Sequence, residues 1–255
     1  MNIFSYFKKS RHRINRDLKD TRIRKYFSPA LLCLDRTFVP LAISHIDGTC
    51  LDIGCGDQPY RGLIESVGAR YESVDIEART ENVTYISDIH DMGVVPRESF
   101  DCAICLEVLE HVSNPFVAVG EIEKVLRPGG KLILSVPHLS RLHEAPHDYF
   151  RYTRYGIHSI LESNGFEVLE MKPTGALFSF LGHQWASATN SLFWSIPVIR
   201  WAVFSINTIV CVYPCYLLDR LFRRNELLPL LHVCVARKVS KSLNRRSVDY
   251  GSSRA

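Results

Sequence analysis

A regular alternation of apolar and amphipathic segments between residues 49 and 173 constrains the fold more than any other feature. Short apolar runs typical of buried strands alternate with helical patterns, and short connections join them. This alternation predicts an α/β fold with a parallel sheet covered by helices on both faces. The expected strands are 49–54, 70–75, 82–88, 100–107, 131–137, 166–173 and 229–238, and the expected helices are 26–46, 59–68, 115–127 and 153–164.

The first expected strand runs into the stretch CLDIGCGDQPY at residues 50 to 60. Gly54 and Gly56 lack side chains, so the backbone of this loop can approach a ligand closely. A dinucleotide-binding loop would carry a third glycine where Pro59 stands, and that glycine lets a pyrophosphate lie against the following helix. The loop therefore predicts a ligand without a pyrophosphate.

Acidic residues end the next two expected strands. Asp75 ends the second strand, about 20 residues after the loop, where a carboxylate can accept hydrogen bonds from both ribose hydroxyls. Asp88 ends the third strand and Ile89 follows it, a pair that suits the exocyclic amine and the ring face of adenine. A ligand with adenine and ribose but no pyrophosphate fits S-adenosylmethionine.

Five motifs carry a resemblance to a known family: LDIGCGDQPY, SVDIE, SDIHDM, FDCAICLEVLEHVSNP and VLRPGGKLILSVP. Together they resemble the class I S-adenosylmethionine-dependent methyltransferases, in the small-molecule branch related to ubiquinone and menaquinone methyltransferases. The resemblance covers residues 47–173 and 229–238. It implies a Rossmann-like, seven-stranded, mostly parallel sheet that ends in an antiparallel hairpin.

The resemblance also implies which residues hold the cofactor, whose demethylated product is S-adenosylhomocysteine. Asp52, Gly54 and Gly56 would surround the methionine part, and Glu107 would lie near the amino-acid end or the methyl group. The full expected cofactor site is Asp52, Gly54, Cys55, Gly56, Asp75, Ile76, Asp88, Ile89 and Glu107. A fold that has lost or never had S-adenosylmethionine binding is the alternative.

The segment PHLSRLHEAPHDYFRYT at 137 to 153 follows the fifth expected strand, beside the expected methyl position. Its pattern is similar to that of family members associated with glycan and lipid pathways. A hydroxyl acceptor usually needs a general base; His143 is the first candidate and His147 the second. The expected substrate-binding residues are His138, Glu144, Asp148, Tyr149 and Arg151.

No metal site is expected. His143 and His147 are four residues apart, but Pro146 argues against the helix that would bring them together. His111 is expected at a helix start or in the cofactor pocket. Cys102 and Cys105 lie in an expected strand, where an offset of three points them to opposite faces. The eight cysteines are therefore expected to be buried reduced thiols, as in a reducing compartment.

An apolar insertion separates the last two expected strands. Residues 201–218 form an uncharged, apolar run that is just long enough to span a bilayer. Pro197 and Pro214, however, are expected to break the helix. Both neighbouring strands return to one sheet, which excludes an odd number of spans. The insertion predicts a monotopic, cytoplasm-facing association in which it re-enters or lies in the interface. The alternative is a pair of helices that pack on the domain or on a dimer partner.

Charge is unevenly distributed along the chain. Residues 1–25 have a net charge of +7 and residues 237–255 of +5, which leaves −8 for the middle of a chain whose total is +4. Basic ends could hold the protein on an anionic leaflet. The expected organisation is a basic helical extension at 1–46, a methyltransferase domain at 47–174 and 226–238, an apolar helical insertion at 175–225, and a basic disordered tail at 239–255.

These observations predict a cytoplasmic enzyme, peripheral or monotopic at the membrane. It would transfer a methyl group from S-adenosylmethionine to an oxygen of a lipid-linked, glycan or other amphipathic acceptor. The alternatives are a methyltransferase for a soluble metabolite whose insertion forms a dimer interface, and a membrane scaffold that binds S-adenosylmethionine without turnover. Nucleic acid is not expected as a partner, because LEVLEH follows the fourth strand in place of an Asn-Pro-Pro-aromatic motif.

Overall fold

The structure, a computed structural model of the 255-residue chain, describes Tyr6, Ser10 and residues 13–14, 16–18, 21–222 and 228–239. The chain divides into two compact units. The helical unit comprises Met1–Pro40, His138–Ser140 and Pro173–His232, and the sheet unit comprises Leu41–Pro137, Arg141–Lys172 and Val233–Ala255. Most of the basic residues expected to face a membrane lie outside the described residues.

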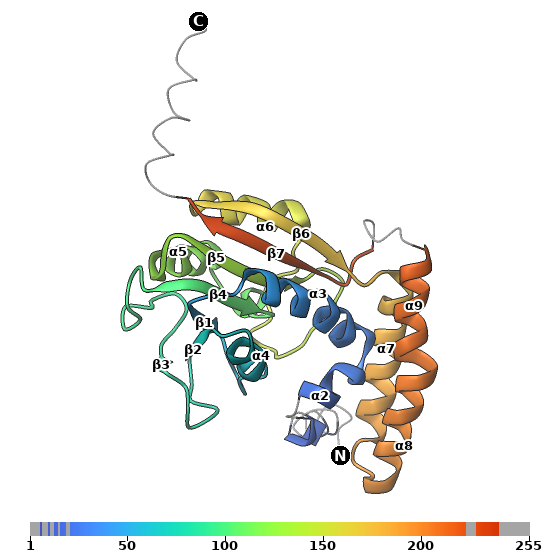
Figure 1. The fold of residues 1–255 in the computed structure, drawn as a ribbon. Helices are drawn as coiled ribbons and strands as arrows, with labels where there is room; N and C mark the ends of the chain where they lie inside the picture. The colour runs from blue at the N-terminus through green and yellow to red at the C-terminus, as the bar shows by residue number, and fades with distance from the viewer. Residues whose placement is uncertain are drawn as a thin grey trace, which may run out of the picture. The chain divides into compact units, whose positions relative to one another are not determined.

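One seven-stranded sheet organises the sheet unit, in the order β3-β2-β1-β4-β5-β7-β6 (Figure 1). Its strands are β1 Thr49–Ile53, β2 Arg70–Asp75, β3 Tyr85–Ile86, β4 Phe100–Leu106, β5 Leu126–Pro137, β6 Phe166–Thr174 and β7 Leu231–Lys238. The pairs β1–β2, β1–β4, β2–β3 and β4–β5 are parallel, whereas the arrows of β6 and β7 run in opposite directions. The predicted fold class, including the antiparallel hairpin at the end, is confirmed. The strand order reverses between β1 and β4, and ligands of open α/β sheets bind at such a point.

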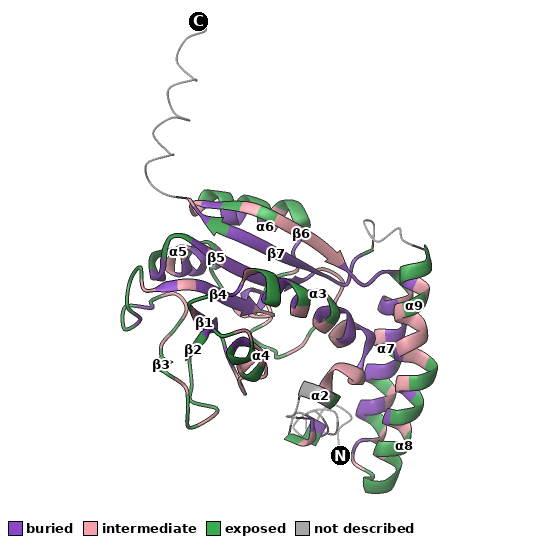
Figure 2. Ribbon diagram, viewed as in Figure 1, coloured by how far each residue is buried: buried purple, intermediate pink, exposed green. Residues whose placement is uncertain are grey.

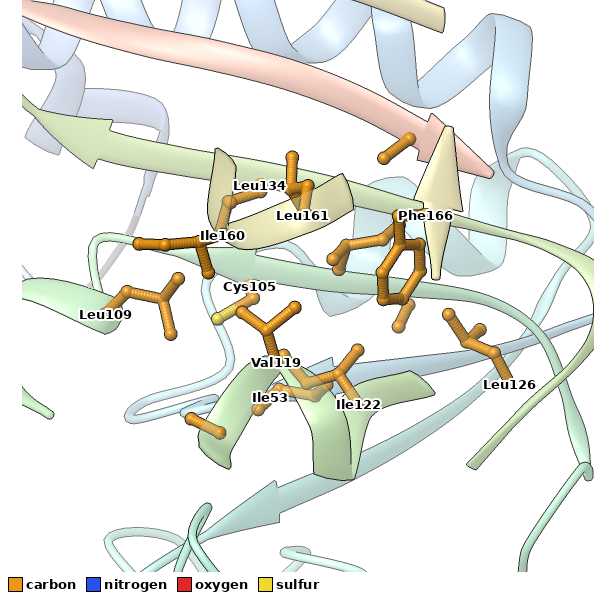
Figure 3. Close-up of a cluster of buried hydrophobic side chains, with 14 of the residues drawn as sticks. Ile53, Cys105, Leu109, Val119, Ile122, Leu126, Leu134, Ile160, Leu161 and Phe166 are labelled. Atoms are coloured by element: carbon orange, nitrogen blue, oxygen red, sulfur yellow. The ribbon is translucent and has the colours of Figure 1, made fainter. Parts of the chain in front are cut away.

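Helices α4 (Arg61–Ser66), α5 (Pro115–Val125) and α6 (Arg154–Ser163) follow the predicted helical segments. The Asn114 side chain caps α5 by accepting a hydrogen bond from the Val117 N–H at 3.3 Å, with Pro115 in the first position. Val119 and Ile122 of α5 and Ile160 and Leu161 of α6 point toward side chains of β1, β4 and β5 (Figure 3). Burial of these aliphatic side chains holds α5 and α6 on the sheet.

The extents of two predicted strands are wrong. The third strand is limited to Tyr85–Ile86, because upstream of it the side chains of Ser73 and Thr84 each accept the other residue's backbone N–H, at 3.1 and 3.2 Å. The fifth strand begins at Leu126 and not at residue 131, because Pro128-Gly129-Gly130 forms an irregularity within the strand. Gly129 has a φ of +81°, which a glycine adopts without strain.

The helical unit contains α2 (Thr21–Arg24), a 3-10 turn at Lys25–Phe27, most of α3 (Pro29–His45), α7 (Leu177–Phe193), α8 (Pro197–Asn207) and α9 (Tyr213–Phe222). Helices α7, α8 and α9 form a hairpin over residues 177–222. Asp219 of α9 accepts the N–H groups of Ala176, Phe178 and Ser179 at 2.8–3.0 Å, so its carboxylate satisfies donors at the start of α7. This contact ties the two ends of the hairpin together.

The second arm of the hairpin is one continuous helix from Pro197 to Phe222. Pro197 is its first residue, as a proline commonly is. The prediction that Pro214 breaks the helix is wrong. A π-helical turn at Thr208–Val212 precedes Pro214, and the Tyr213 N–H donates to the Thr208 carbonyl across this widened turn. A widened turn accommodates a residue that has no N–H to donate.

Candidate functional site

The loop after β1 is tied to the carboxyl end of β2. The Gly54 N–H donates to the Val74 carbonyl at 2.8 Å, and the Gly56 N–H donates to Oδ2 of Asp75 at 2.8 Å. Asp75 is buried at the last position of β2. The side chain of Cys55 is also buried, so only the backbone of this residue is available to a ligand. The structure therefore brings together the loop and the carboxylate that the sequence predicts for one ligand.

The two glycines of the loop serve different purposes. Both have positive φ, +67° for Gly54 and +51° for Gly56. A Cβ on Gly54 would lie 2.5 Å from Cγ2 of Val108, whereas no heavy atom lies within 4 Å of a Cβ built on Gly56. Position 54 must therefore be glycine because any side chain would clash with Val108. Gly56 instead leaves open space in which a ligand can approach the backbone.

Gly54→Ala should lower the free energy of unfolding by about 2–3 kcal/mol, because it combines a clash with Val108 and a left-handed backbone. Gly62→Ala is the matched control. Gly62 lies in α4 with no heavy atom within 4 Å of a built Cβ, so alanine should stabilise the protein by roughly 0.5–1 kcal/mol. Urea unfolding curves measure both changes. Equal stability of the two variants would contradict this account of the loop.

Asp52 lies in β1 with its carboxylate buried, and the Tyr71 hydroxyl donates to its Oδ2 at 2.7 Å. Burial raises the pKa of Asp52 to about 7, partly offset by the hydrogen bond from Tyr71. Burial of an ionised carboxylate is unfavourable for the folded protein, but a cation bound nearby would stabilise the ionised form.

Glu107 follows β4 with a φ of +56°, which is uncommon for a residue other than glycine. The backbone N–H of Glu107 donates to the carbonyl and to Oγ of Ser135, and the Ser135 hydroxyl donates to Oε1 of Glu107 at 2.8 Å. Burial raises the pKa of Glu107 to about 7. Ser135 thus fixes an unusual backbone that presents a carboxyl group at the carboxyl end of β4.

The residues expected near adenine lie after β2 and β3. Ile76 is 66% exposed, and such an exposed aliphatic side chain beside Asp75 is what a bound ring could cover. Ile89 packs partly on the main core. Asp88 accepts hydrogen bonds from the N–H and Nδ1 of His90 at 2.8 and 2.7 Å, and the backbone bond is the main cause of a lowered pKa of Asp88.

The loop after β5 is organised by an ion pair between Asp148 and Arg151. Both guanidinium nitrogens of Arg151 donate to this carboxylate, at 2.6 and 2.8 Å, and they hold the pKa of Asp148 far below its usual range. Oδ2 of Asp148 also accepts the His143 N–H at 2.7 Å and lies 3.3 Å from His143 Nδ1. The pair of Asp148 and Arg151, predicted to bind substrate, thus orients His143.

Glu110 is fully buried beside this loop, on the turn after β4. Its Oε1 lies 3.6 Å from Nε2 of His111 and 3.8 Å from Nε2 of His143. Within the described part of the chain neither carboxylate oxygen of Glu110 has a hydrogen-bond partner. Burial raises the pKa of Glu110 well above its usual value.

Of the other predicted loop residues, Glu144 lies near this cluster, whereas His138 does not. His147 Nδ1 lies 3.1 Å from the Tyr149 hydroxyl, and Oε2 of Glu144 lies 4.0 Å from His111 Nε2. His138 belongs to the helical unit, where its ring lies 5.5 Å from that of His232. Glu144, Asp148 and Arg151 thus lie around His143 and His111, whereas His138 belongs to the helical unit.

The sequence does not indicate that Tyr71, Ser135 and Glu110 contact the predicted site residues. Tyr71 and Ser135 act on carboxylates of neighbouring strands, and only the strand register shows such contacts. Glu110 and His111 were visible within the motif LEVLEHV, but the pattern does not indicate that this glutamate is buried without a hydrogen bond.

Comparison with known proteins identifies the family. Residues 22–171 match the family model described as a methyltransferase domain. A ubiquinone biosynthesis O-methyltransferase of Xanthomonas oryzae is 29% identical over 98 residues, which cover 33% of this chain and 41% of the relative. An uncharacterized 37.1 kDa protein in transposon TN4556 of Streptomyces fradiae is 34% identical over 103 residues, which cover 35% of this chain and 30% of the relative. The chain therefore matches less than half the length of either relative.

Solved structures share the fold at low sequence identity. An S-adenosylmethionine-dependent methyltransferase from Mesorhizobium loti has a TM-score of 0.52 and shares 15% identity, covering 80% of this chain and 97% of its own. A methyltransferase from Archaeoglobus fulgidus has a TM-score of 0.51 and 17% identity, covering 83% and 95%. The family match spans more than half of the chain, so the chain belongs to the methyltransferase domain family and has the class I fold of S-adenosylmethionine-dependent methyltransferases.

Proposed function

We propose that the protein transfers a methyl group from S-adenosylmethionine to a small-molecule acceptor. The observation that carries this proposal is the cradle at the carboxyl ends of β1, β2 and β4. There an open glycine backbone at Gly56 is bonded to Asp75, and the carboxyl groups of buried Asp52 and partly buried Glu107 have raised pKa values. A cation that carries a ribose matches both features.

Isothermal titration with S-adenosylmethionine and S-adenosylhomocysteine tests the cofactor directly. Binding of both, one molecule per chain, is expected. NAD should not bind, because Pro59 replaces the glycine that a pyrophosphate requires. Binding of NAD in preference to S-adenosylmethionine would contradict the proposal.

Affinity for S-adenosylmethionine should rise with pH between about 5.5 and 7.5. Asp52 and Glu107 have pKa values raised to about 7, so both are largely neutral below that pH and ionised above it. The cofactor carries a permanent sulfonium charge and favours the ionised carboxylates, so binding weakens as these groups become protonated. The Asp52→Asn variant should show a shallower pH dependence in the same titrations. An equal slope in both proteins would exclude Asp52 as a source.

The acceptor atom is proposed to be an oxygen, and the acceptor an amphipathic, lipid-linked or glycan molecule. The first support is the histidine-rich loop, because a hydroxyl usually has to lose its proton during transfer. His143 is the first candidate for the group that takes this proton, and His147 is the second. Nδ1 of His143 is oriented by Asp148, an arrangement typical of a histidine base and its orienting carboxylate.

His143→Ala should lower kcat by about 100-fold or more with little change in the affinity for S-adenosylmethionine, because only acceptor activation is lost. The pH profile of turnover should lose its acidic limb in the variant. His158→Ala is the matched control, since His158 lies on α6 in an exposed pair with Glu162. Unchanged turnover of His143→Ala at every pH would show that His143 plays no part in acceptor activation.

The second support is the hairpin, whose first helix buries small and polar residues while many large apolar residues of both arms are exposed; Trp194, Phe204 and Val212 are large apolar residues that it buries. The buried residues of α7 are small or polar: Ser179, Gly182, Ala186, Ser187, Asn190 and Ser191. Its exposed positions include Leu181, Trp185 and Leu192, and the second arm exposes Val198, Ile206, Ile209, Val210, Leu217 and Leu221 (Figure 2). Small residues inside and large apolar residues outside are typical of helices packed within lipid.

Polar side chains bond across the inside of the hairpin. The Asn207 amide donates to Oδ1 of Asn190 at 3.0 Å and to Oγ1 of Thr189 at 2.9 Å. Two further bonds join the hairpin to the N-terminal segment: Arg200 donates to Oδ2 of Asp17 at 2.8 Å, and the indole N–H of Trp194 donates to the same oxygen at 3.1 Å. Among the described residues, the helix Pro197–Phe222 alone is long and apolar enough to cross a membrane, by length and composition.

We infer a monotopic association of residues 175–225 with an anionic bilayer, on the cytoplasmic side. The Leu230 N–H donates to the Thr174 carbonyl at 3.0 Å, so the chain enters and leaves the hairpin at one place. A hairpin that re-enters or lies in the interface satisfies this constraint. The rest of the expected organisation is proposed with it: the basic extension at 1–46, the catalytic domain at 47–174 and 226–238, and the tail at 239–255.

Two other functions remain as outcomes of experiment. A soluble-metabolite enzyme that uses the hairpin as a dimer interface would be an oligomer without detergent and indifferent to vesicles. A membrane scaffold would bind S-adenosylmethionine and never release S-adenosylhomocysteine. The small and polar buried face of α7, together with the exposed apolar residues of both arms, favours the membrane-associated enzyme over the first of these.

A further inference from the structure

The cluster of Glu110, His111 and His143 has a feature that base catalysis by His143 does not require. One potential ligand atom from each residue lies within 4.8 Å of the other two. The two histidine rings approach edge to face with centroids 4.7 Å apart. Both place Nε2 near the same oxygen of Glu110, at 3.6 and 3.8 Å.

The hydrogen bonds of the two rings determine which nitrogen carries the proton. Nδ1 of His111 lies 2.6 Å from the His147 carbonyl, which can only accept, so Nδ1 of His111 is the protonated nitrogen. Nδ1 of His143 lies 3.3 Å from Asp148 Oδ2 and 3.2 Å from the Arg141 carbonyl, both acceptors, with Nη2 of Arg151 at the longer distance of 3.4 Å. In both neutral rings the Nε2 lone pair therefore faces the carboxylate.

With Glu110 ionised and both rings neutral, three electron-pair donors converge on one point. Glu110 is fully buried, and neither of its oxygens has a hydrogen-bond partner in the described part of the chain. A buried carboxylate facing two lone pairs is strongly unfavourable unless a positive charge lies among them. That charge is either a proton or a metal cation.

The geometry points to a divalent transition-metal cation of the zinc class, bound by Glu110, His111 and His143. Two imidazoles and one carboxylate are an established donor set for zinc with an open position. Tetrahedral bonds of about 2.1 Å place ligand atoms about 3.4 Å apart, close to the two distances from Glu110. The acceptors at both Nδ1 atoms match the outer partners that orient metal-binding histidines.

This inference rests on the proposed methyl transfer and refines it. With the cation bound, His143 is a ligand, and the activation assigned to it acts through the cation. An acceptor hydroxyl in the open coordination position would lose its proton to solvent more easily, because the cation stabilises the alkoxide. Asp148 and Arg151 would then be positioning residues that hold the His143 ring.

Titration of the metal-stripped protein with Zn²⁺, and with Co²⁺ as a spectroscopic probe, tests the site without any turnover. One cation per chain is expected, with visible Co²⁺ bands typical of a site with few ligands. Glu110→Gln keeps the shape of the side chain and should weaken binding at least roughly tenfold, as should His111→Ala. Asp148→Asn should weaken it by about 10–100-fold through the orientation of His143. His158→Ala should bind the cation like the wild type.

S-adenosylmethionine binding is measured on the same metal-stripped samples and reports the cradle separately. Cofactor binding without metal binding, or metal binding that Glu110→Gln and His111→Ala leave unchanged, would overturn the metal site while the proposed function stands. It would then assign a proton to the cluster, on Glu110 or a histidine. Loss of cofactor binding in the wild type would overturn the proposed function itself. Thermal unfolding of each variant identifies any that fails to fold, and Asp148→Asn then serves as the second test.

Discussion

Asp75→Asn should weaken the binding of S-adenosylmethionine by about 100-fold. The carboxylate of Asp75 is proposed to accept two hydrogen bonds from the ribose, and charge-assisted hydrogen bonds contribute roughly 1.5–3 kcal/mol each. The asparagine side chain has nearly the same shape as aspartate and retains one oxygen, so it can still accept the hydrogen bond from the Gly56 N–H that shapes the loop. The substitution therefore removes charge and one acceptor while the fold is retained. Isothermal titration at pH 7.5 measures the change.

Glu77→Gln is the matched control for this experiment. Glu77 is another carboxylate close to the end of β2, but its side chain is exposed and pairs with Arg79. An exposed pair contributes little, so the affinity for the cofactor should change less than about threefold. Equal losses in the two variants would show that net charge near β2, and not a ribose contact of Asp75, governs binding.

The second large effect is expected at the hairpin. The double variant Ile206→Lys and Ile209→Lys places two charges on its exposed apolar face, where Ile206 is 60% and Ile209 71% exposed. A lysine at the centre of a bilayer-embedded helix costs about 2.5–3.5 kcal/mol, and less near the interface. Binding to vesicles that contain anionic lipid should therefore fall by roughly 100-fold, as measured by co-flotation.

Val94→Lys is the control for the hairpin variant. Val94 is 63% exposed in the sheet unit and lies outside the hairpin, so lysine there should leave vesicle binding unchanged. Cofactor affinity should be unaffected in both proteins. Retained flotation of the double variant, with a change of oligomeric state instead, would identify the hairpin as a contact between copies of the chain.

The sequence predicts the fold well wherever periodicity and turn chemistry agree. The strand at 70–75 and the helix that starts at Pro115 behind Asn114 occur where they were expected. The positions of Asp75 and Glu107 are equally predictable, because both lie at the ends of strands whose order follows from the family pattern. Contacts between neighbouring strands, such as Tyr71 with Asp52, depend on register and not on local pattern.

Tertiary context explains what the sequence did not indicate. Pro214 should end a helix by its local chemistry, but the π-helical turn before it lets the helix continue. The histidines of the loop after β5 gave no hint that His143 would face Glu110, a residue far away along the chain on the turn after β4. Such convergence depends on how two loops fold at the same edge of a sheet.

Transfer of a labelled methyl group tests the central claim most directly. Purified wild-type protein and Asp75→Asn are given methyl-labelled S-adenosylmethionine and an extract of the host's small molecules and lipids. The products are then separated into organic, aqueous and protein fractions. The account predicts label in the organic fraction, formed by the wild type and largely lost in the variant. Binding of S-adenosylmethionine with no labelled product in any fraction, and no S-adenosylhomocysteine released, would contradict it.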